Sequence, residues 1–257
     1  VLSEVPAAAN LEECRRLLKA AKASKGDYMF GENYVFRAEF DIWKRLIDAG
    51  GIGRVVYAEG EYVHDVRSLF FNADGKPTWR YRFPPIRYCT HSLGPLLYLM
   101  KDRCAVVSGM EIISEDPAAE NGVHIEVGIF RTDKGAVIKI LCGFAVHREP
   151  SVVYYSIYGD RGCMETPREK GSGKCIYHLD KKTAEREGWG DPASEQFSAS
   201  HADADKRMLE LFVEATKSGS KMPLTVEDAV NYTLPGICAQ QSALNGGAPV
   251  EVPDLAV

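Results

Sequence analysis

The pattern of apolar residues changes near Arg54, and this change constrains the fold more than any other feature of the chain. Before it, helix-like spacing over 11–21 and 40–47 alternates with an aromatic, strand-like stretch over 27–36. After it, strand patterns follow one another with almost no helix between them. Alternation is typical of an α/β layer, and consecutive strands are typical of an antiparallel or mixed sheet. The sequence therefore predicts an α+β fold: the closing strand and helix units of an α/β layer, then one large mixed or antiparallel sheet flanked by helices.

Capping and turn residues set the expected ends of these elements. Asn10 with Glu13, and Thr225 with Asp228, have the spacing of a helix N-cap, and Pro235 predicts a kink in the last helix. Strands are expected at 55–63, 105–113, 123–131, 135–147, 152–158, 162–166 and 174–179. Further helices are expected at 91–100, 208–215 and 225–245.

Composition argues against several classes of protein. The net charge is −5, from 31 basic and 36 acidic residues that form no long run of one sign, so we expect no nucleic-acid partner. No apolar run approaches the roughly 20 residues of a membrane helix, so we expect no membrane partner. Seven irregularly spaced cysteines without a CxxC pair predict reduced thiols and a cytoplasmic protein.

The segment Val1–Pro6 begins without a Met and has neither the basic nor the apolar region of a signal peptide. It is typical of the end of a buried strand that runs into a loop. We therefore expect the front of a larger domain to be missing. The alternative is an independent domain whose first strand is short.

Two short segments carry side chains suited to acid–base chemistry or to binding a hydroxylated ligand. On a strand, Tyr62 and His64 would project from the same face. Tyr88 and His91 would lie at the start of a helix that Thr90 or Ser92 could cap, and His can exchange protons near neutral pH. Both segments also have a purely structural interpretation, as a strand end and as a helix start with an incidental histidine.

Other polar side chains give weaker signals. His201 and Asp205 are four apart and would share one helix face, although an acidic first turn also suits the helix dipole. Arg80, Arg82 and Arg87 could grip a carboxylate or simply pair with the surplus acids. No His, Cys, Asp or Glu set has a recognised ligand spacing, so we expect no metal.

Three segments resemble the glucose–fructose oxidoreductase and inositol dehydrogenase family (Gfo/Idh/MocA). Val1–Pro6 is similar to the strand and loop that end in Glu-Lys-Pro, Ile47–Gly53 to a family helix end, and Ser242–Asp254 to the family's usual ending. The resemblance covers nearly the whole chain and implies a Rossmann domain followed by a mixed-sheet domain. Residues 1–36 would then be the remnant of the dinucleotide-binding domain, and 37–257 the substrate and oligomerisation domain. It also implies a homo-oligomer, a dimer or tetramer formed through the sheet.

A closer similarity is to the NAD-dependent α-N-acetylgalactosaminidase branch. It rests on Glu4-Val5-Pro6, Glu32-Asn33-Tyr34, the segments 59–67 and 90–95, and His201 with Asp205. The resemblance implies that Glu4, Val5 and Asn33 contact NAD or NADP. It implies a sugar site lined by Tyr62, His64, Arg80, Thr90 and His201, with His91 and Tyr88 as catalytic residues.

The chain also departs from the family pattern. Val5 stands where dehydrogenases of the family place a Lys, and Arg87 stands where they commonly place an Asp. No Gly-x-Gly-x-x-Gly follows a strand, so the chain has no nucleotide motif of its own. The loop before Tyr88 lacks the usual Gly-Asn lead-in of the glycosidase branch, and the segment after Pro150 does not clearly supply its substrate-contacting Tyr.

Three functions follow from these features. The leading hypothesis is an NAD(P)-dependent oxidoreductase that acts on a small sugar or polyol, and it is inactive without the missing front of the domain. The second is a glycosidase that uses tightly held NAD without net turnover, which the Val at position 5 favours. The third is a non-catalytic sugar-binding or assembly module.

Overall fold

The computed structural model describes residues 1–113, 123–149, 152–168, 176–179, 181–182, 185 and 201–255. These residues form one eight-stranded sheet in the order β10-β4-β5-β6-β3-β7-β8-β9. Neighbouring strands are antiparallel except β3 and β6, which run parallel, so the sheet is mixed as the sequence predicts. The strands are β3 (Val55–Val63), β4 (Cys104–Ile113), β5 (Val123–Thr132), β6 (Val137–Gly143), β7 (Val153–Gly159), β8 (Gly162–Glu165), β9 (Ile176–Leu179) and β10 (Val250–Glu251).

A second, two-stranded sheet pairs β1 (Leu2–Ser3) with β2 (Met29–Phe30) in parallel. Helix α1 (Leu11–Ala23) connects them, and Asn10 caps it by accepting a hydrogen bond from the backbone N–H of Glu13. Parallel neighbours need such a crossover helix, so this is a strand–helix–strand unit. The expected strand over 27–36 is wrong for most of its length. After two paired residues the chain turns into a 3₁₀ helix, Asn33–Phe36, because the Glu32 side chain accepts the backbone N–H of Tyr34.

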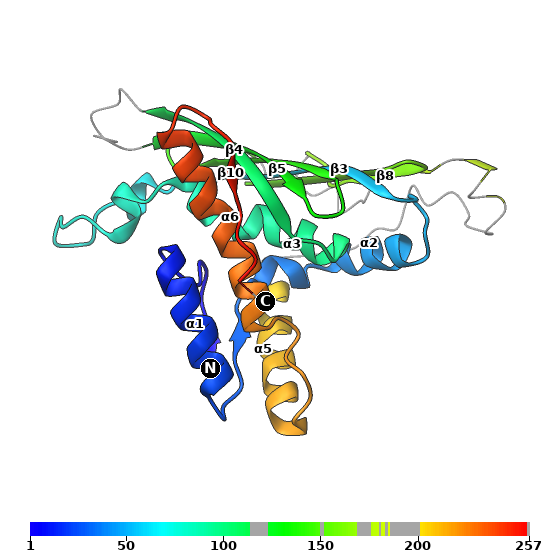
Figure 1. Ribbon diagram of the computed structural model, residues 1–257, viewed down its shortest axis with the longest axis horizontal. Helices are drawn as coiled ribbons and strands as arrows, with labels where there is room; N and C mark the ends of the chain where they lie inside the picture. Colours follow the sequence, from blue (N-terminus) through cyan, green and yellow to red (C-terminus); the bar gives the residue numbers. More distant parts are fainter. Residues whose placement is uncertain are drawn as a thin grey trace.

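Helices cover one face of the large sheet (Figure 1). The helices α2 (Ala38–Asp48), α3 (Thr90–Met100) and α6 (Val226–Leu244) lie against it, while α1 and α5 (His201–Ser218) extend away from it (Figure 1). A Thr225–Asp228 capping box opens α6, as the sequence predicts. We call the face under these helices the inner face and the opposite one the outer face.

Two glycines set how closely the helices approach the inner face. A Cβ on Gly60 of β3 would lie 2.3 Å from the carbonyl oxygen of Ser92 in α3, and one on Gly109 of β4 would lie 2.3 Å from that of Ala239 in α6. No side chain fits at such distances, so glycine at these positions allows backbone-to-backbone contact. Helix α3, and with it the segment around His91, is therefore held directly on β3.

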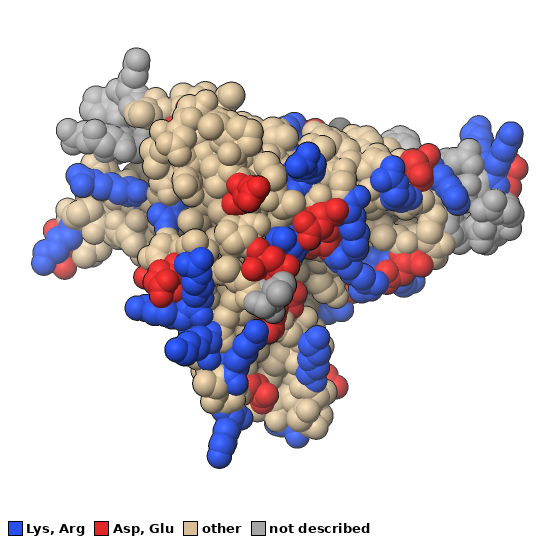
Figure 2. All heavy atoms as spheres, viewed as in Figure 1, with Lys and Arg blue, Asp and Glu red and all other residues tan. Residues whose placement is uncertain are grey.

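The outer face differs in character along the sheet. Its β4 and β5 part exposes aliphatic side chains, including Met110 (69% exposed) and Ile112 (62%). Figure 2 shows few charged side chains near the top of the view, where β4 lies, and charges of both signs around α1 and α5 below. Within the described residues, no helix is long and apolar enough to cross a membrane.

Candidate functional site

A buried carboxylate and a buried histidine form the centre of the candidate site. Glu32, between β2 and the 3₁₀ helix, places Oε1 2.7 Å from Nδ1 of His91, in the first turn of α3. Glu32 is fully buried and His91 is only 7% exposed. A carboxylate on one ring nitrogen favours the tautomer with the proton on that nitrogen, which leaves Nε2 as an acceptor. The pair therefore orients His91 for taking a proton through Nε2.

Aromatic rings surround His91. Its ring centroid lies 4.4 Å from that of Tyr34, 5.0 Å from Tyr88 and 5.2 Å from Tyr62. Phe144 closes the group, 5.6 Å from Tyr88 and 6.4 Å from Tyr62. We call these five residues, Tyr34, Tyr62, Tyr88, His91 and Phe144, the ring cluster. Burial raises the pKa of Tyr34, Tyr62 and Tyr88, so their phenols are neutral donors at physiological pH.

The start of α3 is fixed through its backbone. Tyr155 of β7, fully buried, donates its hydroxyl to the carbonyl of His91. The expected side-chain cap is wrong: Cys89 is the N-cap residue and no side-chain cap is formed. Ser92 instead donates to the carbonyl of Cys89 at 3.1 Å, and Thr90 Oγ1 is buried with no hydrogen-bond partner among the described residues.

The strand β3 brings the other expected pair to the same place. Tyr62 and His64 lie on one face, with the Tyr62 hydroxyl 3.0 Å from His64 Nδ1. Tyr62 also touches His91, so β3 and α3 contribute to a single group. The structure thus brings together Tyr62, His64, Tyr88, Thr90 and His91.

A second buried carboxylate supports the segment that carries Tyr88. The 3₁₀ helix Pro85–Tyr88 lies over β5, where Glu126 accepts the backbone N–H of Ile86 at 2.6 Å. Its other oxygen, Oε1, is buried with no hydrogen-bond partner among the described residues. Burial raises the pKa of Glu126 to about 7, against an opposing effect of the Ile86 hydrogen bond. On the other side, a Cβ on Gly236 of α6 would lie 2.6 Å from the carbonyl oxygen of Ile86, so this segment is clamped between β5 and α6.

Helix α5 reaches the site through an amide. Asn33 donates through Nδ2 to Asp205 of α5 at 2.5 Å. The backbone of His201 begins α5, but its side chain lies outside the described part of the chain. The expectation that His201 and Asp205 share one helix face therefore falls outside the described side chains.

The residues expected at the cofactor side follow the two parallel strands. Glu4 is exposed and Val5 is buried, directly after β1, and Asn33 comes soon after β2. Carboxyl ends of parallel strands form the edge where open α/β sheets bind ligands. The charge of Glu4 contributes to raising the pKa of Tyr88, which indicates that this edge faces the ring cluster.

The three arginines of the 65–89 loop do not act together. Each lies over a different ring: Arg80 over Trp79 at 4.2 Å, Arg82 over Tyr81 at 5.8 Å and Arg87 over Phe83 at 5.3 Å. Only Arg80 acts on the ring cluster, where its charge lowers the pKa of Tyr62 and Tyr88 against the larger effect of burial. Burial lowers the pKa of Arg87, against an opposing effect of the Glu126 charge.

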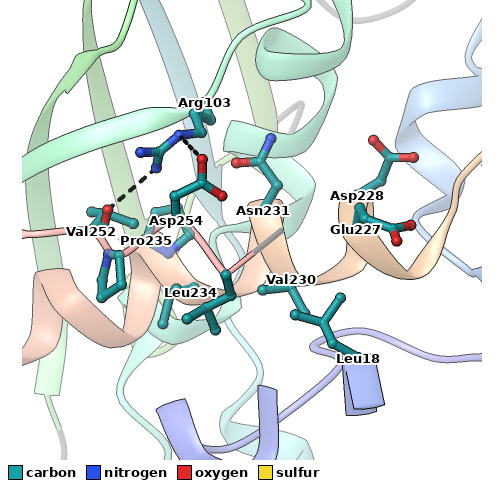
Figure 3. Close-up of a pocket in the computed structure, with 12 residues that line it drawn as sticks. Leu18, Arg103, Glu227, Asp228, Val230, Asn231, Leu234, Pro235, Val252 and Asp254 are labelled. Carbon is teal, nitrogen blue, oxygen red and sulfur yellow. Dashed lines mark hydrogen bonds and ion pairs between the residues drawn. The ribbon is translucent and has the colours of Figure 1, made fainter. Parts of the chain in front are cut away.

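A cavity of about 190 Å³ lies elsewhere, where α1, α6 and the C-terminal segment meet (Figure 3). Its Arg103 is bonded to the carbonyl of Val252 and paired with Asp254 at 3.3 Å (Figure 3). No histidine or cysteine lines it, so it offers no acid–base group that titrates near neutral pH. Among the described residues no group of three or more His, Cys, Asp or Glu could hold a metal ion.

The sequence predicts Tyr62, Tyr88 and His91 of the ring cluster, but not the residues that hold them in place. Glu32 and Tyr34 were quoted only as part of a resembling motif, and Tyr155 and Glu126 gave no signal at all. Glu32 could have been found as a carboxylate directly after a short strand, one position before Asn33. Tyr155 and Glu126 act through partners 64 and 40 residues away, which local sequence patterns do not reveal.

Comparison with known proteins gives consistent matches. A family model described as the C-terminal alpha/beta domain of an oxidoreductase family matches residues 44–252. A glycosyl hydrolase family 109 protein of Solibacter usitatus is 29% identical over 99% of this chain, and the chain spans 65% of that relative's length. An α-N-acetylgalactosaminidase of Bacteroides fragilis is 23% identical over 99% of the chain and 69% of its own length.

Two solved structures that share the fold carry dehydrogenase names. Levoglucosan dehydrogenase, in complex with NADH and L-sorbose, matches with a TM-score of 0.79 and 17% identity, covering 100% of this chain and 74% of that one. The myo-inositol 2-dehydrogenase of Lactobacillus plantarum matches with a TM-score of 0.73 and 15% identity, covering 98% and 73%. At such identities these two matches establish the fold.

Proposed function

Because the chain belongs to the Gfo/Idh/MocA oxidoreductase family, we propose that it carries the sugar site of an NAD(P)-dependent oxidoreductase. The substrate is a small sugar or polyol, and the reaction moves a hydride between one of its carbinol carbons and the nicotinamide. The observation that carries this proposal is the Glu32–His91 pair at 2.7 Å, buried beside three tyrosines. Aromatic faces and phenol hydroxyls suit a ligand with both apolar C–H and polar O–H groups.

The residues at the carboxyl ends of β1 and β2 fit a nicotinamide cofactor. Glu4, Val5 and Asn33 follow these strands. The Thr90 hydroxyl, one residue from His91, is buried and has no hydrogen-bond partner within the described segments. We propose that residues 1–36 are part of a dinucleotide-binding domain, which the parallel β1–α1–β2 unit supports. The bound cofactor would supply the hydride acceptor.

His91 is the proposed base. Burial keeps the tyrosine phenols protonated, so Tyr62 and Tyr88 donate hydrogen bonds that position substrate hydroxyls. With its Nδ1 held by Glu32, His91 accepts the proton of the reacting hydroxyl through Nε2. Val5 cannot take part in proton transfer, and this makes His91 more important than in relatives with a Lys there.

The test is an absorbance assay at 340 nm of the product of the complete reading frame, with NAD and with NADP, over a panel of sugars and polyols. We expect substrate-dependent formation of NADH or NADPH, and we expect the His91→Asn variant to lose it while keeping its fold. Absence of any absorbance change across the panel would remove the main support for an oxidoreductase.

A glycosidase is the second candidate, and two observations favour it. The Solibacter and Bacteroides relatives carry glycosidase names, and Val5 replaces the lysine of ordinary dehydrogenases. Bound NAD would take a hydride from a carbinol carbon of the sugar and so acidify a neighbouring C–H. Loss of that proton would expel the leaving group, water would add in its place, and NADH would return the hydride, so that NAD is regenerated. Release of p-nitrophenol from an N-acetyl-α-galactosaminide without added NAD would support this candidate, and inertness towards all such glycosides would reject it.

We also propose that the protein is a homo-oligomer that buries the aliphatic part of the outer face. Met110 and Ile112 are each more than 60% exposed on β4, and Ile129 is 44% exposed on the neighbouring strand β5, opposite Ser108. Such patches are rare on monomers. Light scattering after size-exclusion chromatography should show a dimer or tetramer for the native protein and a smaller species for Ile112→Lys, and a native monomer would reject the proposal.

A further inference from the structure

The 3₁₀ helix Pro85–Tyr88 connects the buried carboxylate of Glu126 to the ring cluster. Glu126 accepts the backbone N–H of Ile86 at 2.6 Å, and Tyr88, two residues further along the same turn, packs into the ring cluster. Cys89 donates its backbone N–H to the Ile86 carbonyl at 3.1 Å, which closes the turn around Tyr88. Because so short a turn moves as a unit, a displacement at Ile86 also displaces Tyr88.

Helix α6 holds the opposite side of this turn. A Cβ on Gly236 would lie 2.6 Å from the carbonyl oxygen of Ile86, 2.9 Å from Sγ of Cys89 and 3.1 Å from Cα of Arg87. Glycine therefore allows α6 to contact the turn directly, and the turn has no room to move towards α6. Its position is then set from the other side, by the state of the Glu126 side chain.

Glu126 and Arg87 each keep a buried polar atom without a hydrogen-bond partner among the described residues. These atoms are Oε1 of Glu126, which is 1% exposed, and Nε of Arg87, the residue between Ile86 and Tyr88. Burial raises the pKa of Glu126 and the charge of Arg87 opposes this, although these two atoms do not bond to each other. Glu13 of α1 is the other acid that acts on Arg87. A buried carboxylate needs a paired cation and a neutral carboxyl group does not, so the observed arrangement is that of a neutral Glu126.

Among the described residues, the other groups that face Glu126 offer no cation at neutral pH. Glu111 lies opposite it on β4, and Cys142 lies opposite it on β6. The charge of Glu111 adds to burial in raising the pKa of Glu126, while burial raises the pKa of Cys142 to about 12, so that thiol is neutral. His124 lies two residues away on the same face of β5, and a histidine is a cation mainly below neutral pH. An ionised Glu126 therefore attracts Arg87.

We propose that Glu126 is a positioning residue of the sugar site. Its neutral carboxyl group holds Ile86 and so keeps the Tyr88 phenol in the ring cluster, whereas its ionisation draws Arg87 towards β5 and moves Tyr88 away from the sugar. Only a proton is exchanged with water, and Glu126 itself touches no reacting atom. The pKa of Glu126 is raised to about 7, chiefly by burial, so sugar affinity is highest below about pH 7 and falls as the pH rises through that value. This inference rests on the proposed function and names a regulation of the same site by pH.

The first measurement needs no sugar. Trp79 lies 6.0 Å from Tyr88, so its fluorescence reports a movement of Tyr88, and Trp79→Phe identifies its share of the signal. In the product of the complete reading frame with NAD, we expect Trp79 emission to change between pH 5.5 and pH 8.5 with a midpoint near 7. Glu126→Gln should remove the change, because glutamine stays neutral and still accepts the Ile86 N–H. As matched controls, Glu111→Gln should move the midpoint to lower pH and Arg87→Gln to higher pH, since their charges act on Glu126 in opposite directions.

The second measurement is the affinity for D-glucose, D-galactose, N-acetyl-D-galactosamine and myo-inositol, by isothermal titration calorimetry over the same pH range. For a sugar that binds, we expect the native Kd to rise about 5- to 10-fold from pH 5.5 to pH 8.5, at the low end of coupling between sites. Glu126→Gln should keep the low-pH affinity throughout. Any titration of His91 is common to both proteins, so the difference between the two profiles reports Glu126. A merely structural role would instead weaken binding equally at every pH.

Two results would overturn the inference and leave the proposed function intact. One is the same pH profile of sugar affinity in the native protein and in Glu126→Gln. The other is a fluorescence transition that survives Glu126→Gln, because another group would then move Tyr88. If none of the sugars binds at any pH, the proposed function fails and the inference fails with it, even where the fluorescence transition is seen.

Discussion

Strand β3 contributes to two polar regions, one on each face of the sheet, and these regions differ in what their carboxylates and hydroxyls contact. On the outer face, Arg168 donates to both oxygens of Glu61 at 2.8 and 3.0 Å, and Lys139 pairs with Glu59 at 2.8 Å. On the inner face, Tyr62 joins the ring cluster, where Glu32 Oε2 and Thr90 Oγ1 are buried without a hydrogen-bond partner among the described residues. The outer carboxylates are held by cations, although Ser156 Oγ, opposite Glu59 on β7, is also buried without a hydrogen-bond partner among the described residues. On the inner face the unpartnered atoms lie beside the Glu32–His91 pair, and this combination marks the candidate site.

Removing the inner histidine should have the largest effect. We expect His91→Ala to lower kcat/KM by about 10²- to 10⁴-fold, the range of general acid–base catalysis. An outer-face change, Tyr57→Phe, should alter kcat/KM by less than about threefold, because the Tyr57 hydroxyl donates to Glu59 on that face, away from His91. Steady-state kinetics at 340 nm measures both, and a similar loss in the two variants would contradict the functional difference between the faces.

The two faces should also respond to pH in opposite directions. The pKa of Glu126, on the inner face, is raised to about 7, so its folded form holds the proton more tightly than the unfolded chain does. Stability should therefore fall as pH rises from about 4.5 to about 7, by at most about 3 kcal/mol. Burial raises the pKa of Glu59, but its hydrogen bonds to Lys139 and Tyr57 outweigh burial and leave the pKa lowered. Glu59 therefore stabilises the folded protein above its unfolded-state pKa, and this stabilisation is lost as the pH falls below that pKa.

Urea unfolding followed by circular dichroism at pH 5 and pH 8 checks the contribution of Glu126, and a further measurement near pH 3 checks that of Glu59. Glu126→Gln keeps an acceptor for the Ile86 N–H and should be more stable than the native protein at pH 8 but similar at pH 5. The groups that face Glu126 are Arg87, Glu111 and Cys142, and none of them is changed in this variant. Glu59→Gln should instead cost stability at pH 8. Equal pH dependence in Glu126→Gln and the native protein would show that Glu126 is not the source.

Filling the contact between β3 and α3 should have a smaller effect. Gly60→Ala places a Cβ near 2.3 Å from the Ser92 carbonyl, so α3 must shift. We expect a loss of about 1–3 kcal/mol in the free energy of unfolding, typical of overpacking, together with reduced sugar affinity because His91 moves. Gly26→Ala, which meets only an ordinary contact at 3.5 Å, is the control. A Gly60→Ala protein with native stability and affinity would show that this contact does not position the site.

The outer ion pair should give the smallest effect. Arg168 is 50% exposed, so we expect Arg168→Gln to cost about 1 kcal/mol or less and to leave sugar binding unchanged. A double-mutant cycle with Glu61→Gln, at low and high salt, measures the coupling. Coupling that changed sugar affinity would indicate that the outer face communicates with the site.

Local patterns predicted most of the fold because they depend on neighbours in sequence. The β3 span, the helix start at Asn10 and the capping box at Thr225 follow from alternation and cap residues, and the structure confirms them. The strand over 27–36 failed because its aromatic residues pack into the core from a 3₁₀ turn, which hydrophobicity cannot distinguish from a strand.

The candidate site was predictable only in part. Tyr62, Tyr88 and His91 stand out by residue type, and a family resemblance groups them. The residues that hold these side chains in place contact them from distant segments of the chain. In the Glu32–His91 pair, for example, the two residues are 59 positions apart. Such contacts depend on how β2 and α3 meet, and no pattern within one segment encodes that.

We propose that the inner carboxylate, Glu32, acts in chemistry and that the outer carboxylate, Glu61, acts in structure. The most direct test is kcat/KM of Glu32→Gln and Glu61→Gln in whichever assay, NAD(P)H formation or glycoside release, shows turnover by the native protein. We expect Glu32→Gln to lose about 100-fold or more, because His91 is no longer held in its acceptor tautomer, and Glu61→Gln to stay within about threefold. Equal losses in the two variants, or native activity in Glu32→Gln, would contradict the account.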